Sequence, residues 1–404
     1  MQIPDTQLSQ ITKITTQISD DLVKEIYQSA RPSSIILKGS FGRGEPSYLE
    51  NPDGSLTFLS DFEIELISTN FLLEKFNFLK KHKTNLIVSK KYNIKIDIGG
   101  TKLSLYNICP FLYATLKPTI ANYDLKYGSI LLYGNDIRKK IPDFSSEDIP
   151  IEEGIRLIVN RVAEAMLYFD HYTNNNSKDF NDIDQLFFWT NKIVLACQDA
   201  ILIKYGKYHY SYVERNKIFT RLMSDRGLEL NEIIPQFVSL AEKATNYKIN
   251  PKKRYVENSL EFWFKIIPFV QKILIFLIQN EKKDFADVPA IKILDDFFIG
   301  SKKGFHISNK ITIFIKYWLN QNKIIPLSLI KRMNYDWTQL FYFVILCTYF
   351  STEKNDPENF EYRRISQKIL DEINGQVLKN EDFSEIPFQQ LSQSAIYYWK
   401  SICY

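Results

Sequence analysis

Near the start of the chain, apolar residues recur every three or four positions and then crowd into a short run. The periodic positions are Leu8, Ile11, Ile14, Ile18, Leu22 and Ile26. This spacing puts them on one face of a helix, so we predict an amphipathic helix over residues 6–29. The run at residues 34–38 (SIILK) ends at a glycine. We predict a strand there that delivers the chain into a loop.

Two further segments carry strand-like patterns. Residues 58–68 alternate apolar and acidic side chains, and residues 86–98 (LIVSKKYNIKIDI) contain two short apolar runs. Such segments favour strands, so we predict one strand in the first segment and two strand-like pieces in the second. Between residues 47 and 58, the sequence Asn51-Pro52-Asp53-Gly54 predicts the turn of a hairpin.

The pattern becomes helical beyond about residue 150. Long segments that are poor in glycine cover residues 152–172, 184–205, 212–223 and 259–280, and each predicts a helix. A polar loop at residues 174–177 and a lysine-containing segment at residues 300–304 interrupt them. We therefore predict an α+β protein. A mixed sheet flanked by helices occupies residues 1–150, a helical domain residues 151–300, and a C-terminal helical region residues 301–404.

Composition narrows the class of protein. The 404 residues are 45% hydrophobic and 24% charged, which is typical of folded globular chains of more than one domain. The formal charge is +4, from 51 basic and 47 acidic residues. This excess is too small to indicate nucleic-acid binding by itself, so a nucleic-acid partner stays open.

Cysteine usage and hydropathy favour a cytoplasmic protein that does not contact a membrane. The cysteines lie far apart without zinc-site spacing, at Cys109, Cys197, Cys347 and Cys403. We expect them to be reduced thiols. No secretory signal is evident at the N-terminus. The two most apolar segments are residues 262–278 and 340–350. Lysines and a proline interrupt the first, and the second is too short to cross a bilayer. We expect both to be core helices.

A glycine-rich loop, GSFGRGE at residues 39–45, directly follows the first predicted strand. Glycines allow backbone N–H groups to approach a phosphate closely. Ser40 adds a hydroxyl donor and Arg43 a permanent positive charge. Glycine after a strand is also ordinary turn chemistry, so the loop alone does not identify a phosphate site.

Acidic residues recur on the next two strand-like segments. Asp61, Glu63 and Glu65 alternate with apolar residues and lie on one side of a strand with a period of two. Asp97 alternates with isoleucines in a later segment and would project toward the same surface. An exposed strand edge is the alternative for the first group. A salt bridge to Lys95 is the alternative for Asp97.

The order of these features is more specific than any one of them. A strand, a Gly-Ser loop, an acid-x-acid strand and a later strand with one acid together resemble the DNA polymerase beta-like nucleotidyltransferase superfamily. GSFGRGEP followed by SDFE is similar to bacterial uridylyltransferases, whose loop reads GGYGRGE and leads to SDxD. The segment LLYGND at residues 131–136 resembles a Tyr-Gly-x-Asp segment of small nucleotidyltransferase domains. The chain departs in its extra hairpin and in Glu63, where Asp is commoner.

The resemblance covers about residues 30–140 and implies a function. It implies that NMP is transferred from an NTP to a hydroxyl-bearing acceptor, with release of pyrophosphate and dependence on Mg²⁺ or Mn²⁺. The implied catalytic residues and metal ligands are Asp61, Glu63 and Asp97. The implied nucleotide-binding residues are Gly39, Ser40 and Arg43. Related enzymes also place a helical lysine against the triphosphate, and Lys192 is the candidate here, with a solvated helix face as its alternative.

Several functions remain open. The acceptor is a small molecule, a protein or an RNA, and a cyclic-oligonucleotide synthase or an RNA-modifying enzyme would use the same site. A non-catalytic nucleotide-binding scaffold is the alternative from another class. The tyrosine-rich segment 207–212 with Arg215 is compatible with stacking on a base or with ordinary packing between helices. Arg156 and Asn160 form a further polar pair on one helix face.

Overall fold

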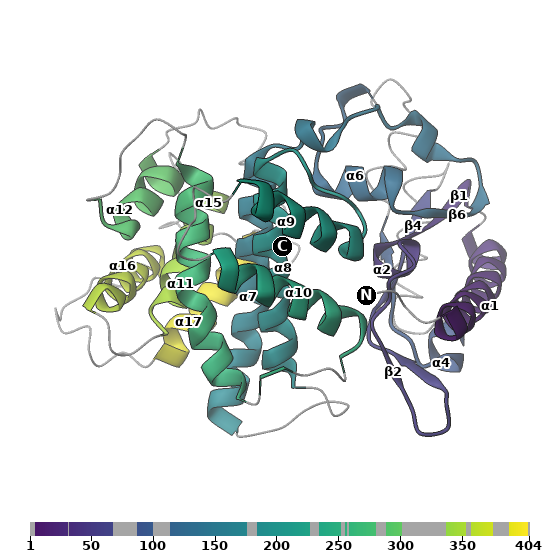
Figure 1. The fold of residues 1–404 in the computed structure, drawn as a ribbon, viewed down its shortest axis with the longest axis horizontal. Coiled ribbons are helices and arrows are strands. Elements are labelled where there is room, and N and C mark those ends of the chain that lie inside the picture. The colour runs from purple at the N-terminus through teal and green to yellow at the C-terminus, as the bar shows by residue number, and fades with distance from the viewer. Residues whose placement is uncertain are drawn as a thin grey trace. The chain divides into compact units, whose positions relative to one another are not determined.

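The chain divides into two compact units, which Figure 1 shows with their elements labelled. The first comprises Met1–Glu153 and Leu202–Tyr255, and the second Gly154–Ile201 and Val256–Tyr404. The computed structural model describes residues 5–30, 32–67, 87–99, 114–175, 184–226, 234–251, 255–256, 258–279, 288–300, 337–352, 357–374 and 388–402.

The first unit is built on a mixed four-stranded sheet. Its strands are β1 (Ser34–Lys38), β4 (Phe62–Ile67), β5 (Ile96–Gly99) and β6 (Ile130–Gly134), in the order β5-β4-β1-β6. β1 pairs antiparallel with both β4 and β6, whereas β4 and β5 are parallel. The predicted strand at residues 34–38 is therefore confirmed.

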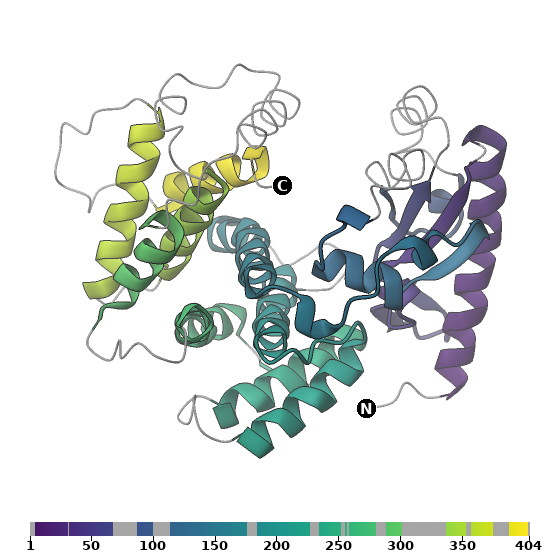
Figure 2. The same cartoon turned by 90° about the horizontal axis from the view of Figure 1, so that it is seen from above.

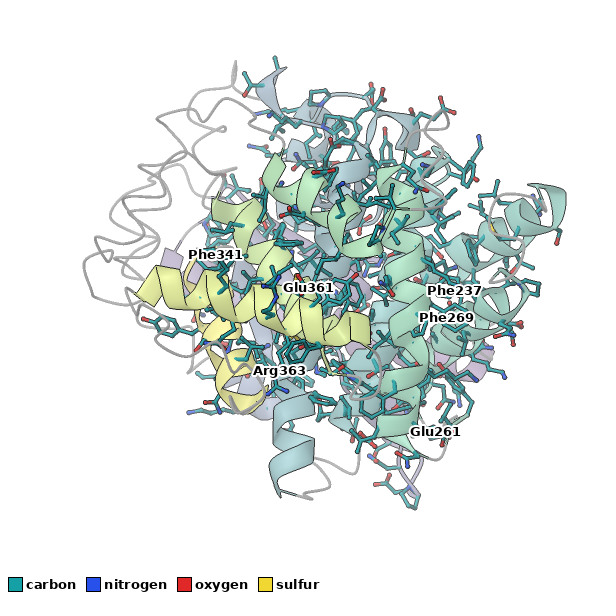
Figure 3. All side chains as sticks on the ribbon, turned by 90° about the vertical axis from the view of Figure 1, so that its left-hand side faces the viewer. Phe237, Glu261, Phe269, Phe341, Glu361 and Arg363 are labelled. Atoms are coloured by element: carbon teal, nitrogen blue, oxygen red, sulfur yellow. The ribbon has the colours of Figure 1, made fainter. Side chains whose placement is uncertain are left out.

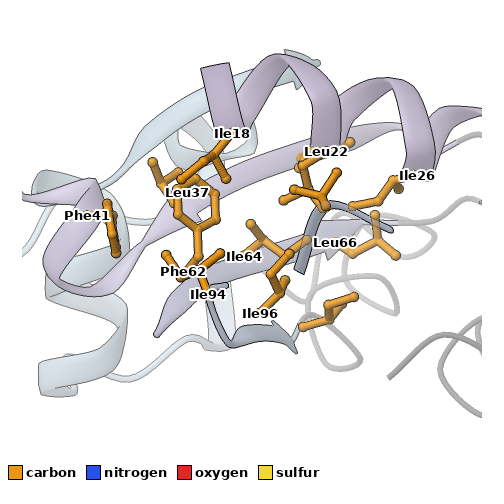
Figure 4. Packing of buried hydrophobic residues seen from close by; sticks show 13 residues of the cluster. Ile18, Leu22, Ile26, Leu37, Phe41, Phe62, Ile64, Leu66, Ile94 and Ile96 are labelled. Atoms are coloured by element: carbon orange, nitrogen blue, oxygen red, sulfur yellow. The ribbon is translucent and has the colours of Figure 1, made fainter. Parts of the chain in front are cut away.

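The helix α1 (Asp5–Ala30) lies along one face of this sheet (Figure 2). Its periodic apolar residues Ile18, Leu22 and Ile26 are fully buried. Figure 4 shows them packed against alternate residues of the strands, among them Phe62 and Ile64. Full burial of such side chains contributes about 1.5–3 kcal/mol each. Since strand residues alternate between faces, the residues between these apolar ones point away from α1.

The hairpin is confirmed, but one predicted strand is wrong. β2 (Tyr48–Glu50) pairs antiparallel with β3 (Leu56–Phe58) across the expected turn. Residues 87–91, predicted as a strand-like piece, form the helix α4 (Ile87–Lys91) instead. The carboxylate of Glu25 on α1 accepts hydrogen bonds from the N–H groups of Ile87 and Val88, at 2.9 and 3.1 Å. This cap from a distant segment satisfies the first turn of α4.

The remaining helices of the first unit are short connections followed by a helical pair. They are α6 (Ile120–Tyr127), η2 (Ile137–Lys140), η3 (Ser146–Asp148), α9 (Tyr212–Arg226) and α10 (Ile234–Ile249). Ile36, Ile67, Leu125 and Ile137 form a second cluster, on the sheet face opposite α1. This cluster covers part of that face.

The second unit is helical in the part that the structure describes. Its elements are α7 (Ile151–Asn175), α8 (Gln185–Lys204), α11 (Ser259–Ile278), α12 (Ala290–Asp295), a π-helical turn η4 (Asp296–Gly300), α15 (Trp337–Phe350), α16 (Pro357–Asn374) and α17 (Phe388–Ile402). The first residues of α7, up to Glu153, and the last residues of α8, from Leu202, belong to the first unit. The four long helices predicted from the sequence are confirmed to within a few residues, and so is the α+β class. The predicted domain boundaries stay a prediction.

Aromatic residues hold the helices of the second unit together. Trp263 of α11 stacks on Phe169 of α7, with ring centroids 4.7 Å apart, and its indole N–H donates to Thr352 Oγ1 at 3.1 Å. Tyr362 of α16 is buried, and its hydroxyl accepts from Gln271 of α11 at 2.9 Å. Figure 3 shows Glu361 and Arg363 on the same helix.

One helix of the described chain, α8, is long and apolar enough to cross a membrane by length and composition alone. Of its apolar window, 83% is buried inside the structure. The core helix of a folded protein passes the same test, so this finding is weak evidence for a membrane span. Cys197 of α8 and Cys347 of α15 are buried free thiols, whereas Cys109 and Cys403 lie outside the described residues.

Candidate active site

A row of charged residues crosses three strands on the sheet face opposite α1. Phe62, Ile64 and Leu66 of β4 are buried under α1, so Glu63 and Glu65 point the other way. In the strand register, Lys38 of β1 is paired with Glu63, and Glu63 is paired with Asp97 of β5. Residues paired in this way project from the same face. We call this side of the sheet, with Lys38, Asp61, Glu63, Glu65, Lys95 and Asp97, the acid face.

Glu63 and Asp97, two of the three predicted metal ligands, therefore occupy neighbouring positions. Neither carboxylate makes a hydrogen bond or an ion pair with any residue that the structure describes. Asp97 is exposed and Glu63 is partly exposed. Two adjacent carboxylates that form no ion pair repel each other, so this pair favours the approach of a cation.

Asp61, the third predicted ligand, has a different partner. The Nζ atom of Lys95 lies 2.5 Å from Asp61 Oδ2. The two side chains are 75% and 37% exposed, so this is a surface ion pair of low energy. The salt bridge considered for Asp97 thus forms with Asp61 instead, because Lys95 lies beside Asp61 in the register of β4 and β5.

Lys38 is the residue of this site that sequence reasoning missed. Its Nζ atom lies 2.8 Å from Glu65 Oε2, and both side chains are largely buried. Burial lowers the pKa of Lys38, but attraction to Glu65, Glu63 and Asp97 outweighs it, and the net pKa is raised. The sequence feature that could have identified Lys38 is its position at the end of a buried strand, directly before the Gly-Ser loop.

The Gly-Ser loop forms the one-turn helix α2 (Gly39–Gly42) beside Glu63. Gly39 has φ +66°, and a Cβ atom there would lie 2.3 Å from Glu63 Oε1. The left-handed conformation favours glycine, and an added side chain would also displace the carboxylate of Glu63. Ser40 is buried, and its hydroxyl has no hydrogen-bond partner among the described residues. The loop and the acid face therefore meet at Gly39.

Gly99, on β5, also leaves room for charged side chains of the acid face because it has no side chain of its own. A Cβ atom on Gly99 would lie 2.8 Å from Glu65 Oε2 and 3.1 Å from Lys38 Nζ. The Lys38–Glu65 ion pair thus lies directly over the backbone of β5. A side chain at this position would force the pair to move.

Arg43 lies in a buried ion pair. Its Nη1 atom is 3.0 Å from Asp124 Oδ2, and the hydroxyl of Tyr208 donates to Asp124 Oδ1 at 3.1 Å. Burial raises the pKa of Asp124, against the attraction of Arg43 and Arg215. The guanidinium of Arg43 also lies 5.1 Å from the ring centroid of Tyr212. The predicted contact of Arg43 with a phosphate stays a prediction, since here the guanidinium is engaged by Asp124.

Glu45, at the end of the glycine-rich loop, caps the helix α9. Its carboxylate accepts from the Ser211 hydroxyl at 2.6 Å and from the N–H groups of Tyr212 and Val213 at 2.7 and 3.2 Å. An acidic side chain at a helix N-terminus satisfies unpaired N–H groups and the helix dipole. The second half of the loop motif thus attaches the loop to α9.

The tyrosine-rich segment is packed inside the first unit. The guanidinium of Arg215 lies 4.0 Å from the ring centroid of Tyr212 and 5.0 Å from that of Tyr208. Tyr208 is buried against Tyr123. These contacts agree with packing, the alternative to stacking on a base.

The Tyr-Gly-x-Asp segment ends the edge strand β6. Gly134 has φ +79°, and a Cβ atom there would lie 2.0 Å from the carbonyl oxygen of Ser33. Asp136 accepts from the N–H of Arg138 at 3.2 Å and pairs with its guanidinium at 2.7 Å. The pKa of Asp136 is lowered by these hydrogen bonds from Arg138. The described contacts of this segment are structural.

Lys192 lies on α8 in the second unit. Its Nζ atom is 3.7 Å from a ring centroid of Trp189 and 4.8 Å from that of Phe188. These are cation–π contacts. Asn160, on α7 of the same unit, accepts from the indole N–H of Trp399 at 3.2 Å. The predicted contact of Lys192 with a triphosphate stays a prediction.

The residues of the acid face fit a divalent cation in part. Carboxylate oxygens are the ligands that Mg²⁺ and Mn²⁺ prefer, and the adjacent Glu63 and Asp97 supply two of them. Within the described chain, however, no three His, Cys, Asp or Glu side chains are grouped to hold a metal ion. Asp61 is held by Lys95, so the predicted set of three ligands is not assembled.

Comparison with known proteins does not identify a family for this chain. No family model matches the chain, and no curated protein or solved structure matches it either. The likeness to nucleotidyltransferases therefore rests on the sequence motifs.

Proposed function

We propose that the first unit carries a nucleotidyltransferase active site, in a polymerase-beta-like domain, that transfers NMP from an NTP to a hydroxyl-bearing acceptor. The observation that supports this proposal is the pair Glu63 and Asp97, side by side on β4 and β5, where neither forms an ion pair with a described residue and Glu63 lies next to Gly39. The same residues carry the resemblance in the sequence.

In this proposal, the Gly-Ser loop binds the triphosphate. The Ser40 hydroxyl, which has no partner in the described chain, donates to a phosphate oxygen. The missing side chain at Gly39 lets the phosphate approach the backbone. The acceptor oxygen attacks the α-phosphorus, the bond to pyrophosphate breaks, and Asp97 accepts the proton of the acceptor hydroxyl.

Asp61, Glu63 and Asp97 would hold the Mg²⁺ or Mn²⁺. When bound, such a cation neutralises phosphate charge and makes the attack of a hydroxyl on the α-phosphorus easier. For Asp61 to take part, its ion pair with Lys95 has to open, which costs little for an exposed pair.

A second candidate is a nucleotide-binding protein without catalytic activity. The Asp61–Lys95 ion pair favours it, because it removes one acid from the predicted ligand set. The two candidates differ in one property. Both bind a nucleotide, but only the enzyme moves the α-phosphate onto an acceptor.

The test is a transfer assay with each α-labelled NTP in Mg²⁺ or Mn²⁺, with and without total RNA and a metabolite extract. We expect label on a product from the native protein, and none from Glu63→Gln or Asp97→Asn. Asp53→Asn, in the turn of the β2–β3 hairpin, is the matched control and should transfer normally. Binding of an NTP without any transfer would favour the second candidate. Neither binding nor transfer would overturn both.

A further inference from the structure

A cavity of about 280 Å³ lies in the first unit, between α1 and the edge strand β6. Leu37 of β1 and Phe41 of α2 line it, and Figure 4 shows both on the side of the sheet that α1 covers. The acid face is on the opposite side of the sheet. The cavity is therefore separate from the candidate active site, although Phe41 and Gly44 of the Gly-Ser loop form part of its wall.

The apolar part of the wall reaches the surface of the first unit. Leu8 and Ile130 line the cavity, and these residues are 43% and 45% exposed. Ile11, Leu37 and Phe41 line it as well and are buried. Exposed apolar side chains at a cavity are typical of a site for an apolar ligand. The volume is just below the usual lower limit of about 300 Å³ for ligand pockets, so the cavity fits a small molecule.

The polar part of the wall is one face of α1. The hydroxyls of Thr12, Thr16 and Ser19 each donate to the carbonyl oxygen four residues earlier, at 2.8, 3.0 and 2.7 Å. A hydroxyl has a single proton, so these groups have only acceptor lone pairs left for a ligand. Asp20 is exposed and forms no hydrogen bond or ion pair with a residue that the structure describes. Apart from Thr15, the polar side chains of this wall therefore offer acceptors.

The charge of the wall indicates the class of ligand. Asp20 is the one charged side chain among the described residues that line the cavity. A carboxylate beside hydroxyl acceptors attracts a positively charged hydrogen-bond donor and repels an anion. An ammonium group has this chemistry, because it has three donors and no acceptor. The apolar residues of the wall favour a hydrocarbon body on the same molecule.

We propose that this cavity binds a small amine with an apolar body, whose ammonium group is held by Asp20 and the hydroxyls of α1. The inference goes beyond the proposed function and does not depend on it, since no residue of the acid face takes part. The ligand contacts the Gly-Ser loop from the side that α1 covers, at Phe41 and Gly44.

The experiment compares three probes that share one apolar ring, namely cyclohexylmethylamine, cyclohexylmethanol and cyclohexanecarboxylate. Their binding to the full-length protein is measured by ligand-observed nuclear magnetic resonance at pH 7 and fixed salt. We expect the amine to bind about fivefold more tightly than the alcohol, which is the upper range for an exposed ion pair. The carboxylate should bind more weakly than either. In Asp20→Asn, the amine should lose its advantage over the alcohol.

Two further variants locate the binding. Asp21→Asn removes the neighbouring acid of α1, which is paired with Lys91 of α4, and should keep the preference for the amine. Thr15→Phe places a larger side chain on the cavity wall and should abolish binding of both the amine and the alcohol. Thermal unfolding identifies a variant that fails to fold. If Thr15→Phe does not fold, the comparison of Asp20→Asn with Asp21→Asn carries the test.

The outcomes are independent of the transfer assay. Equal affinity of the native protein for the amine and the alcohol would overturn the inference, as would no binding of any probe. So would a preference for the amine that persists in Asp20→Asn, because the charge of the wall would then play no part. Each of these results leaves the proposed function standing.

Discussion

Glu63 and Asp97 are directly paired residues on the parallel strands β4 and β5, and neither forms an ion pair or a hydrogen bond with a described residue, although both attract Lys38. Like charges on paired positions destabilise a sheet. Apart from Glu63 and Asp97, the carboxylates of the acid face have a lysine partner within 2.8 Å. The two acids without an ion pair are two of the three that the sequence motifs assign to metal binding, and the third, Asp61, is paired with Lys95.

The fit between Gly39 and Glu63 gives a prediction on stability. Gly39→Ala should lower the free energy of unfolding by about 1–2 kcal/mol for the left-handed backbone, and further because its Cβ would lie 2.3 Å from Glu63 Oε1. Gly44 has φ +71° and open space around it, so Gly44→Ala should show the backbone cost alone. Urea denaturation measures both. Equal losses would contradict the close contact at Gly39.

Glu45 should stabilise the first unit through its cap on α9. Glu45→Ala removes three hydrogen bonds to a charged acceptor and should cost about 2–4 kcal/mol. Glu50, on the β2–β3 hairpin, serves as the control. Its carboxylate accepts one exposed hydrogen bond from Gln7 of α1, so Glu50→Ala should change the free energy of unfolding by less than about 0.5 kcal/mol. Chemical denaturation compares the two. A Glu45→Ala protein as stable as Glu50→Ala would show that the cap contributes nothing.

The lowered pKa of Asp136 predicts a pH dependence. The folded protein holds Asp136 ionised through Arg138, so its pKa lies below the ordinary 3.8. The resulting stability is fully present above pH 3.8 and is lost as the pH falls through the lower, folded pKa. Asp136→Asn still caps η2 but carries no charge. We expect it to be less stable than the native protein at pH 7 and equally stable in strong acid, by thermal unfolding across pH. A difference that does not change with pH would refute this.

The ion pair between Lys95 and Asp61 gives a prediction on whether Asp61 is a metal ligand, the point on which the second candidate function rests. Lys95→Met leaves Asp61 without its partner, and the loss of an exposed ion pair should change stability by less than about 1 kcal/mol. If Asp61 is a ligand, the variant should bind Mn²⁺ more tightly than the native protein. Unchanged affinity would indicate that Asp61 stays outside the cation site.

Local patterns in the sequence account for much of this fold. The spacing of Ile18, Leu22 and Ile26 predicts α1, and the alternation around Glu63 predicts β4. The helix α4 could not be predicted from local sequence, because its first turn is capped by Glu25, which lies 62 residues from Ile87.

The candidate site was predictable only where its chemistry is local. The Gly-Ser loop and the acids stand in motifs, whereas the register that places Lys38 beside Glu63 and Lys95 beside Asp61 is set by strand pairing. Arg43 shows the same limit, because its partner Asp124 is 81 residues away. Neither the strand register nor the ion pair of Arg43 with Asp124 can be predicted from the spacing of residues in the sequence.

A role of Glu63 and Asp97 in nucleotidyl transfer can be tested without knowledge of the acceptor. The measurement is the release of pyrophosphate from each NTP in Mn²⁺, with a mixture of RNA and metabolites present. We expect release by the native protein and at least a hundredfold loss in Asp97→Asn that folds normally, because the proposed proton acceptor is removed. Release that is equal in the native protein and in Asp97→Asn would contradict nucleotidyl transfer at this site, as would a native protein that releases none.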